Sequence, residues 1–302
     1  MKTFLCLHTG ALGDFILTWP GLMLLRRHFP GHHFLGAGRP DYLRLAVRLG
    51  YLDSGVDVDF REMIPLFNGT NVPGCLTGVD GAVLWLRGAE AAVDLLQRNA
   101  GLPVLALDPF PSSSTHLGLQ YCREAARTFG FHAPEDIHSL FPLKASGDGP
   151  VFIHPGSGGT AKCFEPGFYL DLGGSLRSLG LKDIRYILGP AEMERGLASH
   201  FPADQTVIPE NVSLLAELLS GAGMYIGNDS GPSHLAGVLG VRSFVIYIKT
   251  DPGVWGAMGK GVRIVRSENE DDALRKIIRD VVPGIKTRGK TRNLSSRARS
   301  GI

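Results

Sequence analysis

Residues 224–239 read MYIGNDSGPSHLAGVL, and this stretch decides the fold. The apolar start, MYI, predicts a buried strand, and the turn formers and helix N-caps of GNDSGP predict a short polar loop. The apolar residues that follow predict a helix that begins at about Ser233. A strand, a small loop and a helix start direct backbone N–H groups and the positive end of a helix dipole at an anion. We therefore predict an anion-binding loop here, around Ser230 and Gly231.

Two side chains flank this loop and suggest what it binds. Asp229 is acidic, so it suits a sugar hydroxyl or a ring nitrogen better than a phosphate. His234 lies near the start of the helix and is expected to face the same cleft. Ser230, His234 and Asp229 could also be the triad of a hydrolase. However, the G-x-S-x-G turn is absent and the three residues are too close in sequence for the usual triad.

The N-terminal residues repeat the same design. Residues 4–7 are apolar and predict a buried strand, after which HTGALGD places Gly10 and Gly13 in a turn. Asp14 then stands in the first turn of a helix, where the helix dipole stabilises a carboxylate. Many such aspartates have no function beyond this one. Pro20 predicts a kink or a break in the helix.

A third glycine-rich turn follows a strand predicted at 151–154, in the sequence HPGSGGTAK. Gly156 belongs to this turn, and Lys162 after it could neutralise a diphosphate as a point charge. A lysine at such a position could equally be a solvated surface residue. Residues 184–188 predict a further strand, and Glu192 follows it at the start of the next helix.

Strands and helices alternate through both halves of the chain, which predicts parallel sheets. We expect two Rossmann-like domains, 1–145 and 150–285, joined by a linker with the sequence KASGDGP. Glycine turns after strands in both halves predict a ligand at the carboxyl edges of both sheets. Residues 286–302 hold six basic residues and no acid, and they are expected to form a disordered tail. Taking these six charges from the total of +2 leaves −4 for the rest of the chain.

The composition is that of an ordinary globular protein, with 302 residues, 44% of them hydrophobic and 20% charged. The four cysteines are scattered, so neither a disulfide framework nor a metal-binding pair is expected. We see no signal peptide and no apolar run of the ~20 residues that span a membrane, which predicts a cytoplasmic protein, either soluble or peripheral. The basic tail could contact anionic lipid, but it lacks the interleaved aromatic residues that favour nucleic-acid binding.

Two further patterns are candidates for ligand binding. The sequence VDVDF at 56–60 contains a D-x-D that could bind a metal and a diphosphate, although its alternation favours a half-exposed strand with solvated acids. Arginines of the first half, chiefly Arg61 and Arg87, could meet an anionic acceptor. Arginines at such positions are more often simply solvated.

Several of these motifs resemble one family. GNDSGPSHLAGVLGV resembles the donor-binding signature of the heptosyltransferase-like glycosyltransferases, which include the ADP-heptose:lipopolysaccharide heptosyltransferases. TGALGDFILTWPGLMLLRRHFP resembles the opening motif of that family, THLGLQYCREAARTFG its helix opened by a histidine, and GPAE its nucleotide-side segment. HPGSGGTAKCFEPGFYLDL resembles a further segment but departs from it, because Phe164 and Glu165 stand where Trp-Pro is usual.

The resemblance implies a GT-B fold, with an acceptor-binding N-terminal domain and a donor-binding C-terminal domain. It implies an inverting, metal-independent transfer of a sugar, most simply heptose from ADP-heptose, to a lipopolysaccharide core or a related glycan, without a cofactor. Asp14 would be the general base. The donor and its diphosphate would be held by Lys162, Glu192, Asp229, Ser230, Gly231, Ser233 and His234. Two alternatives stay open: the same fold with another donor, and a nucleotide-sugar-binding paralogue without catalysis, against which the presence of both Asp14 and Lys162 weighs.

Overall fold

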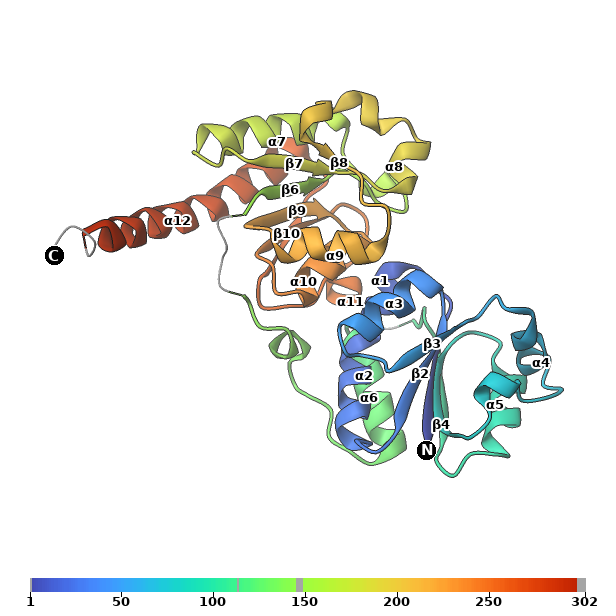
Figure 1. Ribbon diagram of the computed structural model, residues 1–302. Helices are drawn as coiled ribbons and strands as arrows, with labels where there is room; N and C mark the ends of the chain where they lie inside the picture. Colours follow the sequence, from blue (N-terminus) through green and yellow to red (C-terminus); the bar gives the residue numbers. More distant parts are fainter. Residues whose placement is uncertain (1, 113, 145–148, 298–302) are drawn as a thin grey trace.

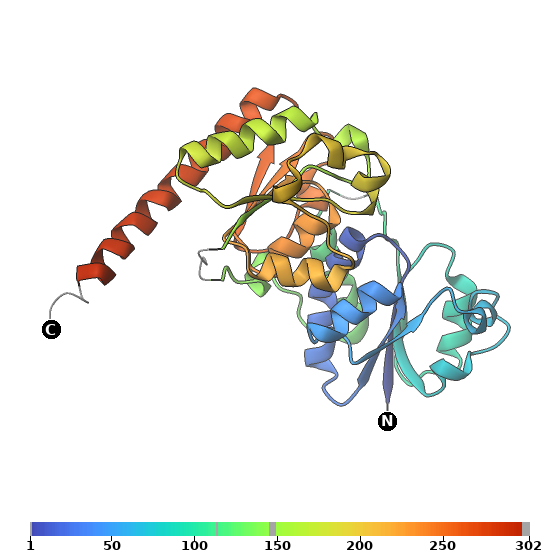
Figure 2. The same cartoon turned by 45° about the horizontal axis from the view of Figure 1, so that its top comes forward.

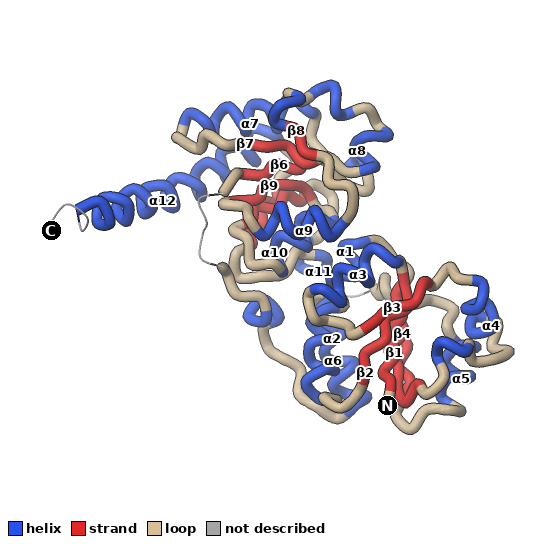
Figure 3. The backbone as a smooth tube through the Cα atoms, viewed as in Figure 1, coloured by secondary structure: helices blue, strands red, loops and turns tan. Residues whose placement is uncertain are grey.

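The computed structural model describes residues 2–112, 114–144 and 149–297, and their side chains as far as residue 283. The chain forms two α/β units, each built on a parallel sheet (Figures 1 and 3). This arrangement confirms the predicted fold class of two domains with parallel sheets.

The N-terminal domain has a five-stranded sheet in the order β3-β2-β1-β4-β5. All four of its strand pairs are parallel. Its strands are β1 (Thr3–His8), β2 (His33–Gly38), β3 (Ser54–Asp57), β4 (Val79–Trp85) and β5 (Val104–Leu107). Its helices are α1 (Leu12–Leu17), α2 (Trp19–His28), α3 (Pro40–Arg48), α4 (Ile64–Phe67), α5 (Glu90–Gln97) and α6 (Leu117–Phe129), with short 3-10 turns η1 (Arg61–Met63), η2 (Gly74–Leu76) and η3 (Ile137–Leu140).

Helices cover both faces of this sheet because its strands are apolar on both sides. Phe4 and Cys6 of β1 pack in one core cluster with residues of α1, α2, α3 and α6. Leu5 and Leu7 point to the other face and pack with residues of α4 and α5. Buried strands with two apolar faces are the pattern expected for a parallel sheet between two layers of helices.

The C-terminal domain has a six-stranded sheet in the order β11-β10-β9-β6-β7-β8, also with parallel pairing throughout. Its strands are β6 (Val151–His154), β7 (Ile184–Ile187), β8 (Thr206–Val207), β9 (Met224–Asn228), β10 (Ser243–Tyr247) and β11 (Val262–Arg266). Its helices are α7 (Pro166–Ser178), α8 (Pro190–Glu194), α9 (Val212–Ser220), α10 (Gly231–Val238), α11 (Pro252–Trp255) and α12 (Glu270–Arg297), with 3-10 turns η4 (Thr160–Lys162), η5 (Leu197–His200) and η6 (Ala203–Gln205).

Each sheet reverses its strand order at one point, between β1 and β4 in the first sheet and between β6 and β9 in the second. Open parallel sheets bind ligands beyond the carboxyl ends of the strands at such a switch point. The loops after β1, β6 and β9 carry the three glycine-rich turns of the sequence. The topology therefore brings together motifs that are more than 200 residues apart.

The two domains are in direct contact through helices. Helix α1 packs on α10, and α3 packs on α9. One core cluster includes Leu12 of α1 together with Leu235 of α10, so the apolar core continues across the interface. An ion pair between Arg48 of α3 and Glu217 of α9 lies at the rim of the same contact.

The structure agrees with one local prediction and differs from two. The helix after β1 is interrupted at Thr18, and Pro20 lies in the first turn of α2, as the proline predicted. Strand β3 ends at Asp57 rather than continuing to Phe60, because the Asp57 carboxylate accepts a hydrogen bond from the Asp59 N–H and turns the chain.

The second difference concerns residues 286–297 of the predicted disordered tail, 286–302, whose last five residues lie outside the described part of the chain. Helix α12 continues through Arg297 and extends away from the body of the protein (Figures 1 and 2). Lysine and arginine are good helix formers, so this segment can extend a helix that has already begun in the packed body. The predicted linker, 144–150, falls largely on residues 145–148, which lie outside the described residues. Among the helices described, none combines the length and the apolar character needed to span a membrane.

Candidate functional site

Asp14 lies in the first turn of α1, directly after the turn that follows β1. Gly10 permits this position, since a Cβ there would lie 3.3 Å from the Asp14 Oδ2 atom. Burial raises the pKa of Asp14, although a hydrogen bond from the Ala11 backbone and the nearby His234 and Lys162 act in the opposite direction. A carboxylate with a raised pKa is a better proton acceptor than an ordinary surface aspartate.

The first turns of α1 and α10 approach each other closely through two glycines. A Cβ on Gly231 would lie 2.9 Å from the Leu12 Cβ, and one on Gly13 would lie 3.2 Å from the His234 Cδ2. Larger residues at either position would push the helices apart. The two glycines therefore bring Asp14 of one domain beside the polar loop of the other.

Lys162, in the 3-10 turn η4 after β6, forms an ion pair with Asp229 in the loop after β9. The Lys162 Nζ lies 2.7 Å from the Asp229 Oδ2, and the His234 Nε2 lies 3.8 Å from the Asp229 Oδ1. Burial alone raises the pKa of Asp229, but contacts with His234, Lys162 and Thr250 outweigh it and lower the pKa to about 2. Asp229 is therefore ionised at neutral pH and holds Lys162 in place.

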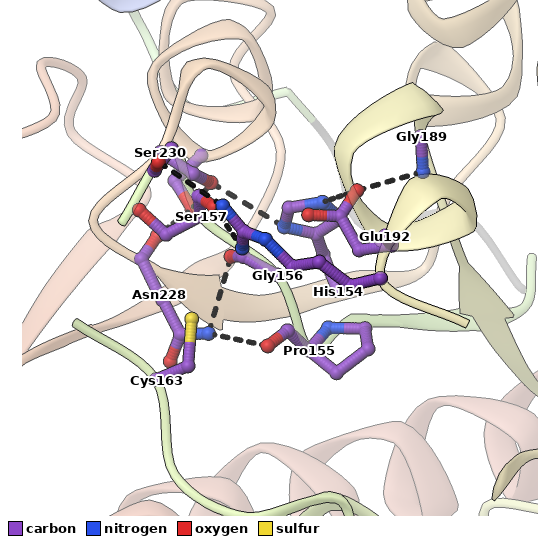
Figure 4. A network of polar contacts seen from close by, with 12 residues as sticks. His154, Pro155, Gly156, Ser157, Cys163, Gly189, Glu192, Asn228 and Ser230 are labelled. Atoms are coloured by element: carbon purple, nitrogen blue, oxygen red, sulfur yellow. Dashed lines mark hydrogen bonds and ion pairs between the residues drawn. The ribbon is translucent and has the colours of Figure 1, made fainter. Parts of the chain in front are cut away.

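A network of hydrogen bonds joins the loops after β6 and β9 (Figure 4). The Asn228 Nδ2 donates to the carbonyl oxygens of Pro155 and Gly156 at 2.9 and 3.2 Å. The Ser157 hydroxyl donates to the Asp229 carbonyl at 2.6 Å. The sequence did not predict Asn228 and Ser157 as site residues, because an asparagine or a serine in a glycine-rich turn indicates no more than turn propensity.

Glu192 is almost fully buried, with 3% of its surface exposed. Its Oε2 accepts a hydrogen bond of 2.8 Å from the Gly189 N–H and lies 3.6 Å from the His154 Nε2. Burial on its own raises the pKa of Glu192, but these contacts lower it overall. The carboxylate therefore has protein partners of its own, and Figure 4 shows it packed beside His154 and Gly156.

Two adjoining cavities lie along the domain contact. The first, of about 420 Å³, is lined by Asp14, Lys162, Asp229 and His234. The second, of about 330 Å³, is lined by His154, Glu192 and apolar residues of β7 and α9, and by Asp41 and Tyr42 of α3 from the N-terminal domain. Both cavities share Ser157, Gly158, Ser230 and Gly231. Together they form a continuous candidate site from Asp14 to the carboxyl end of β7.

Five predicted site residues line neither cavity, and two of them, Gly10 and Gly156, are glycines of the turns beside the site. Ser233 is fully buried, donates its hydroxyl to the Asn228 carbonyl and lines neither cavity. Arg87 binds Asp108 through its guanidinium, and Arg61 lies in η1, and neither lines the two cavities. Within the described part of the chain, no group of three or more His, Cys, Asp or Glu residues has the arrangement of a metal site.

The comparisons with known proteins identify the family. No curated protein sequence matches this chain. Among solved structures, a family 9 glycosyl transferase from Veillonella parvula has 16% identity and a TM-score of 0.69 over 88% of this chain and 86% of its own. Heptosyltransferase WaaC of E. coli with ADP has 18% identity and a TM-score of 0.68 over 94% and 100%. The ADP-heptose lps heptosyltransferase II of E. coli has 14% identity and a TM-score of 0.71 over 96% and 100%.

At these identities the structural matches show the fold alone, and it is the GT-B arrangement of the heptosyltransferases. The sequence match is more specific. The family model described as glycosyltransferase family 9 (heptosyltransferase) matches residues 118–280, which include Lys162, Asp229 and His234. The chain therefore belongs to glycosyltransferase family 9, the heptosyltransferase family.

Proposed function

We propose that this protein transfers a sugar, with inversion at the anomeric carbon, from a nucleotide diphosphate donor to a glycan acceptor. ADP-heptose is the proposed donor, and a lipopolysaccharide core or a related glycan is the proposed acceptor. Two similar structures support the donor, since they hold E. coli WaaC with ADP and with ADP-2-deoxy-2-fluoro heptose. A same-fold enzyme with a different nucleotide sugar is the main competing proposal.

One observation carries this proposal: Asp14 of the N-terminal domain and the Lys162–Asp229 pair of the C-terminal domain line the same cavity. In the proposed reaction Asp14 removes the proton of an acceptor hydroxyl as its oxygen attacks the anomeric carbon. The bond from that carbon to the diphosphate oxygen breaks on the opposite face, and the transition state has oxocarbenium character. The proton is then on Asp14, the acceptor oxygen is bonded to the anomeric carbon, and the nucleotide diphosphate has left.

The departing diphosphate carries negative charge that must be stabilised as it develops. Lys162 and the start of α10 supply positive electrostatic potential to this cavity. We propose that Lys162 turns from Asp229 to the diphosphate when the donor binds, and that Asp229 keeps the lysine within reach. Because Lys162 and the start of α10 supply the positive charge that the diphosphate needs, we propose a transfer that requires neither a metal nor a cofactor.

The second cavity suits the nucleoside. Ile187 and Leu215 give it an apolar wall, and Glu192 lies at its base near the start of α8. Tyr42 closes it from the other domain. The shared loop residues Ser157 and Gly231 then fall between nucleoside and sugar, where the diphosphate would lie. We propose the cytoplasm as the place of action, with a glycolipid acceptor met at the inner face of the cytoplasmic membrane.

Calorimetric titration of the purified protein with ADP, UDP, GDP and CDP, with and without magnesium, tests the donor. We expect selective binding of ADP that is insensitive to magnesium and weakened at least tenfold in Lys162→Ala, because a charge-assisted contact to the diphosphate is lost. A preference for UDP or GDP would overturn the donor while leaving the fold untouched. Binding of none of the four would support a paralogue that lacks catalysis.

Transfer itself is tested with ADP-heptose and de-O-acylated lipopolysaccharide core oligosaccharides of defined length. Asp14→Asn is expected to reduce kcat by about 100-fold or more, because the amide cannot accept the proton. Its ADP affinity and its thermal unfolding should match those of the unaltered protein. Substantial turnover by Asp14→Asn would remove Asp14 from the role of base.

A further inference from the structure

Two aromatic rings flank the first cavity, one from each domain. Phe110 follows β5 in the N-terminal domain, and Trp255 ends α11 in the C-terminal domain. Their ring centroids lie 5.8 Å apart with an interplanar angle of 35°. Phe110 is 48% exposed although it is a large apolar residue. Exposed aromatic surface at a cavity that also holds a proposed base indicates a binding surface.

The position of Phe110 is fixed by a charged residue. The Arg87 Nε and Nη2 atoms lie 2.7 and 3.1 Å from the two Asp108 carboxylate oxygens. Arg87 also donates to the Phe110 carbonyl and lies 5.5 Å from the centre of its ring. Asp108 in turn accepts a hydrogen bond of 2.8 Å from the Phe110 N–H. The sequence suggested that Arg87 could bind an anionic acceptor, but in the structure it holds the residues around Phe110 in place.

The position of Trp255 is fixed from the other domain. His116, the N-cap of α6, lies with its Nε2 2.8 Å from the carbonyl oxygen of Gly256, the residue after Trp255. Its Nδ1 accepts a hydrogen bond from the Gly118 N–H, so Nε2 carries the proton and donates to Gly256. Burial lowers the pKa of His116 to about 4, which keeps the ring neutral in this role. Specific polar contacts thus hold the backbone at Phe110 and directly after Trp255.

Aromatic rings held in this way suit a carbohydrate. One face of a pyranose ring presents several C–H bonds with partial positive charge, and the face of an aromatic ring is partially negative. An anionic group would be a poor occupant of this aromatic pair, because the charge of Arg87, the cation beside the Phe110 ring, is already balanced by Asp108. The pair therefore favours a sugar ring over a phosphate.

We propose that Phe110 and Trp255 form an aromatic platform that binds a pyranose ring of the acceptor and presents its hydroxyl to Asp14. This inference rests on the proposed glycosyl transfer. We assign the platform to the acceptor because the acceptor hydroxyl must reach Asp14, which lines the same cavity as the two rings. The nucleoside cavity joins the first cavity through Ser157, Gly158, Ser230 and Gly231, whereas Phe110 and Trp255 line the first cavity alone.

The test compares variants that remove a ring with variants that keep one. We expect Phe110→Leu and Trp255→Leu each to raise the KM for a de-O-acylated lipopolysaccharide core oligosaccharide about tenfold, with ADP affinity within about twofold. Phe110→Tyr and Trp255→Phe should keep most of the acceptor affinity. Phe60→Leu is the matched control, because Phe60 is also an exposed phenylalanine of the N-terminal domain, at 58%, and does not line the cavity.

Three outcomes would overturn the proposal. The first is an unchanged acceptor KM in both leucine variants. The second is a loss of affinity for ADP-heptose but not for ADP, which would assign the platform to the donor sugar. The third is an acceptor KM that rises equally in Phe60→Leu. Thermal unfolding of each variant checks that the fold is retained.

A binding measurement separates failure of the platform from failure of the proposed transfer. The protein has three tryptophans, of which Trp19 and Trp85 are 0% and 2% exposed. Quenching of tryptophan fluorescence by the oligosaccharide in the presence of ADP should therefore report on Trp255. We expect quenching in the unaltered protein, its loss in Trp255→Phe and about tenfold weaker binding in Phe110→Leu, whether or not transfer occurs. No quenching by any core oligosaccharide would overturn the platform independently of activity.

Discussion

Gly156 offers a direct test of the geometry around the nucleoside cavity. A Cβ on Gly156 would lie 1.8 Å from the Glu192 Oε1, 2.1 Å from its Cδ and 2.5 Å from its Cγ. Glu192 cannot move aside without cost, because its carboxylate is buried and accepts a hydrogen bond from the Gly189 N–H. We therefore expect Gly156→Ala to be strongly destabilising.

The magnitude follows from two contributions. Overpacking a filled site costs about 1–3 kcal/mol. Displacing a buried carboxylate from its hydrogen bond and its histidine neighbour adds about 1–2 kcal/mol. The expected loss in the free energy of unfolding is about 3 kcal/mol, which would lower the urea midpoint by roughly 1.5 M for an m value of about 2 kcal/mol/M.

Gly159→Ala in the same loop is the matched control, since nothing lies within 4 Å of a Cβ at that position. It should change the free energy of unfolding by no more than about 0.5 kcal/mol. The double variant Gly156→Ala with Glu192→Ala should lose less stability than the two single changes added together, because the clash is gone. If urea unfolding gave Gly156→Ala and Gly159→Ala the same midpoint, the packing of Glu192 on this turn would be refuted.

The remaining predictions concern protons. Burial raises the pKa of Asp14 above its ordinary value of 3.8, and only the ionised carboxylate accepts a proton. We therefore expect kcat/KM to fall as the pH falls through this raised pKa. A pH profile of kcat/KM with an acid midpoint at or below 3.8 would contradict this expectation. The pKa of Asp229 in the folded protein is about 2, so its ion pair contributes roughly 2 kcal/mol to the free energy of unfolding above pH 4, and this contribution is lost as the pH falls towards 2. Asp229→Asn should remove this pH dependence from acid unfolding curves. An unchanged pH dependence in the variant would contradict the ion pair as its source.

Local sequence pattern was enough to predict the elements that carry the site. The strand, loop and helix around Asp229 follow from an apolar run, turn formers and a second apolar run, and β9 and α10 lie where that pattern put them. The break before Pro20 follows from the missing N–H of proline. In each case the cause lies within a few residues of its effect, so periodicity and turn chemistry suffice.

Contacts between distant segments could not be predicted in this way. His116 reaches Gly256 across 140 positions of sequence, and no local pattern links the two. The same holds for Phe110 and Trp255, and for Glu192, whose carboxylate has a buried histidine as its neighbour. The sequence does not show that Arg87 has an acidic partner, because Asp108 becomes its neighbour only when β4 pairs with β5.

The close approach of α1 and α10 links the fold to the proposed chemistry. A base in one domain and a donor loop in the other can act on one bond only if the domains meet at a fixed distance. Gly13 and Gly231 set that distance, because each lies against a residue of the opposite domain with no room for a side chain of average size. The interface core around Leu12 and Leu235 stabilises this contact between the domains. The site is therefore a property of the interface, and this is why neither half of the sequence contains it alone.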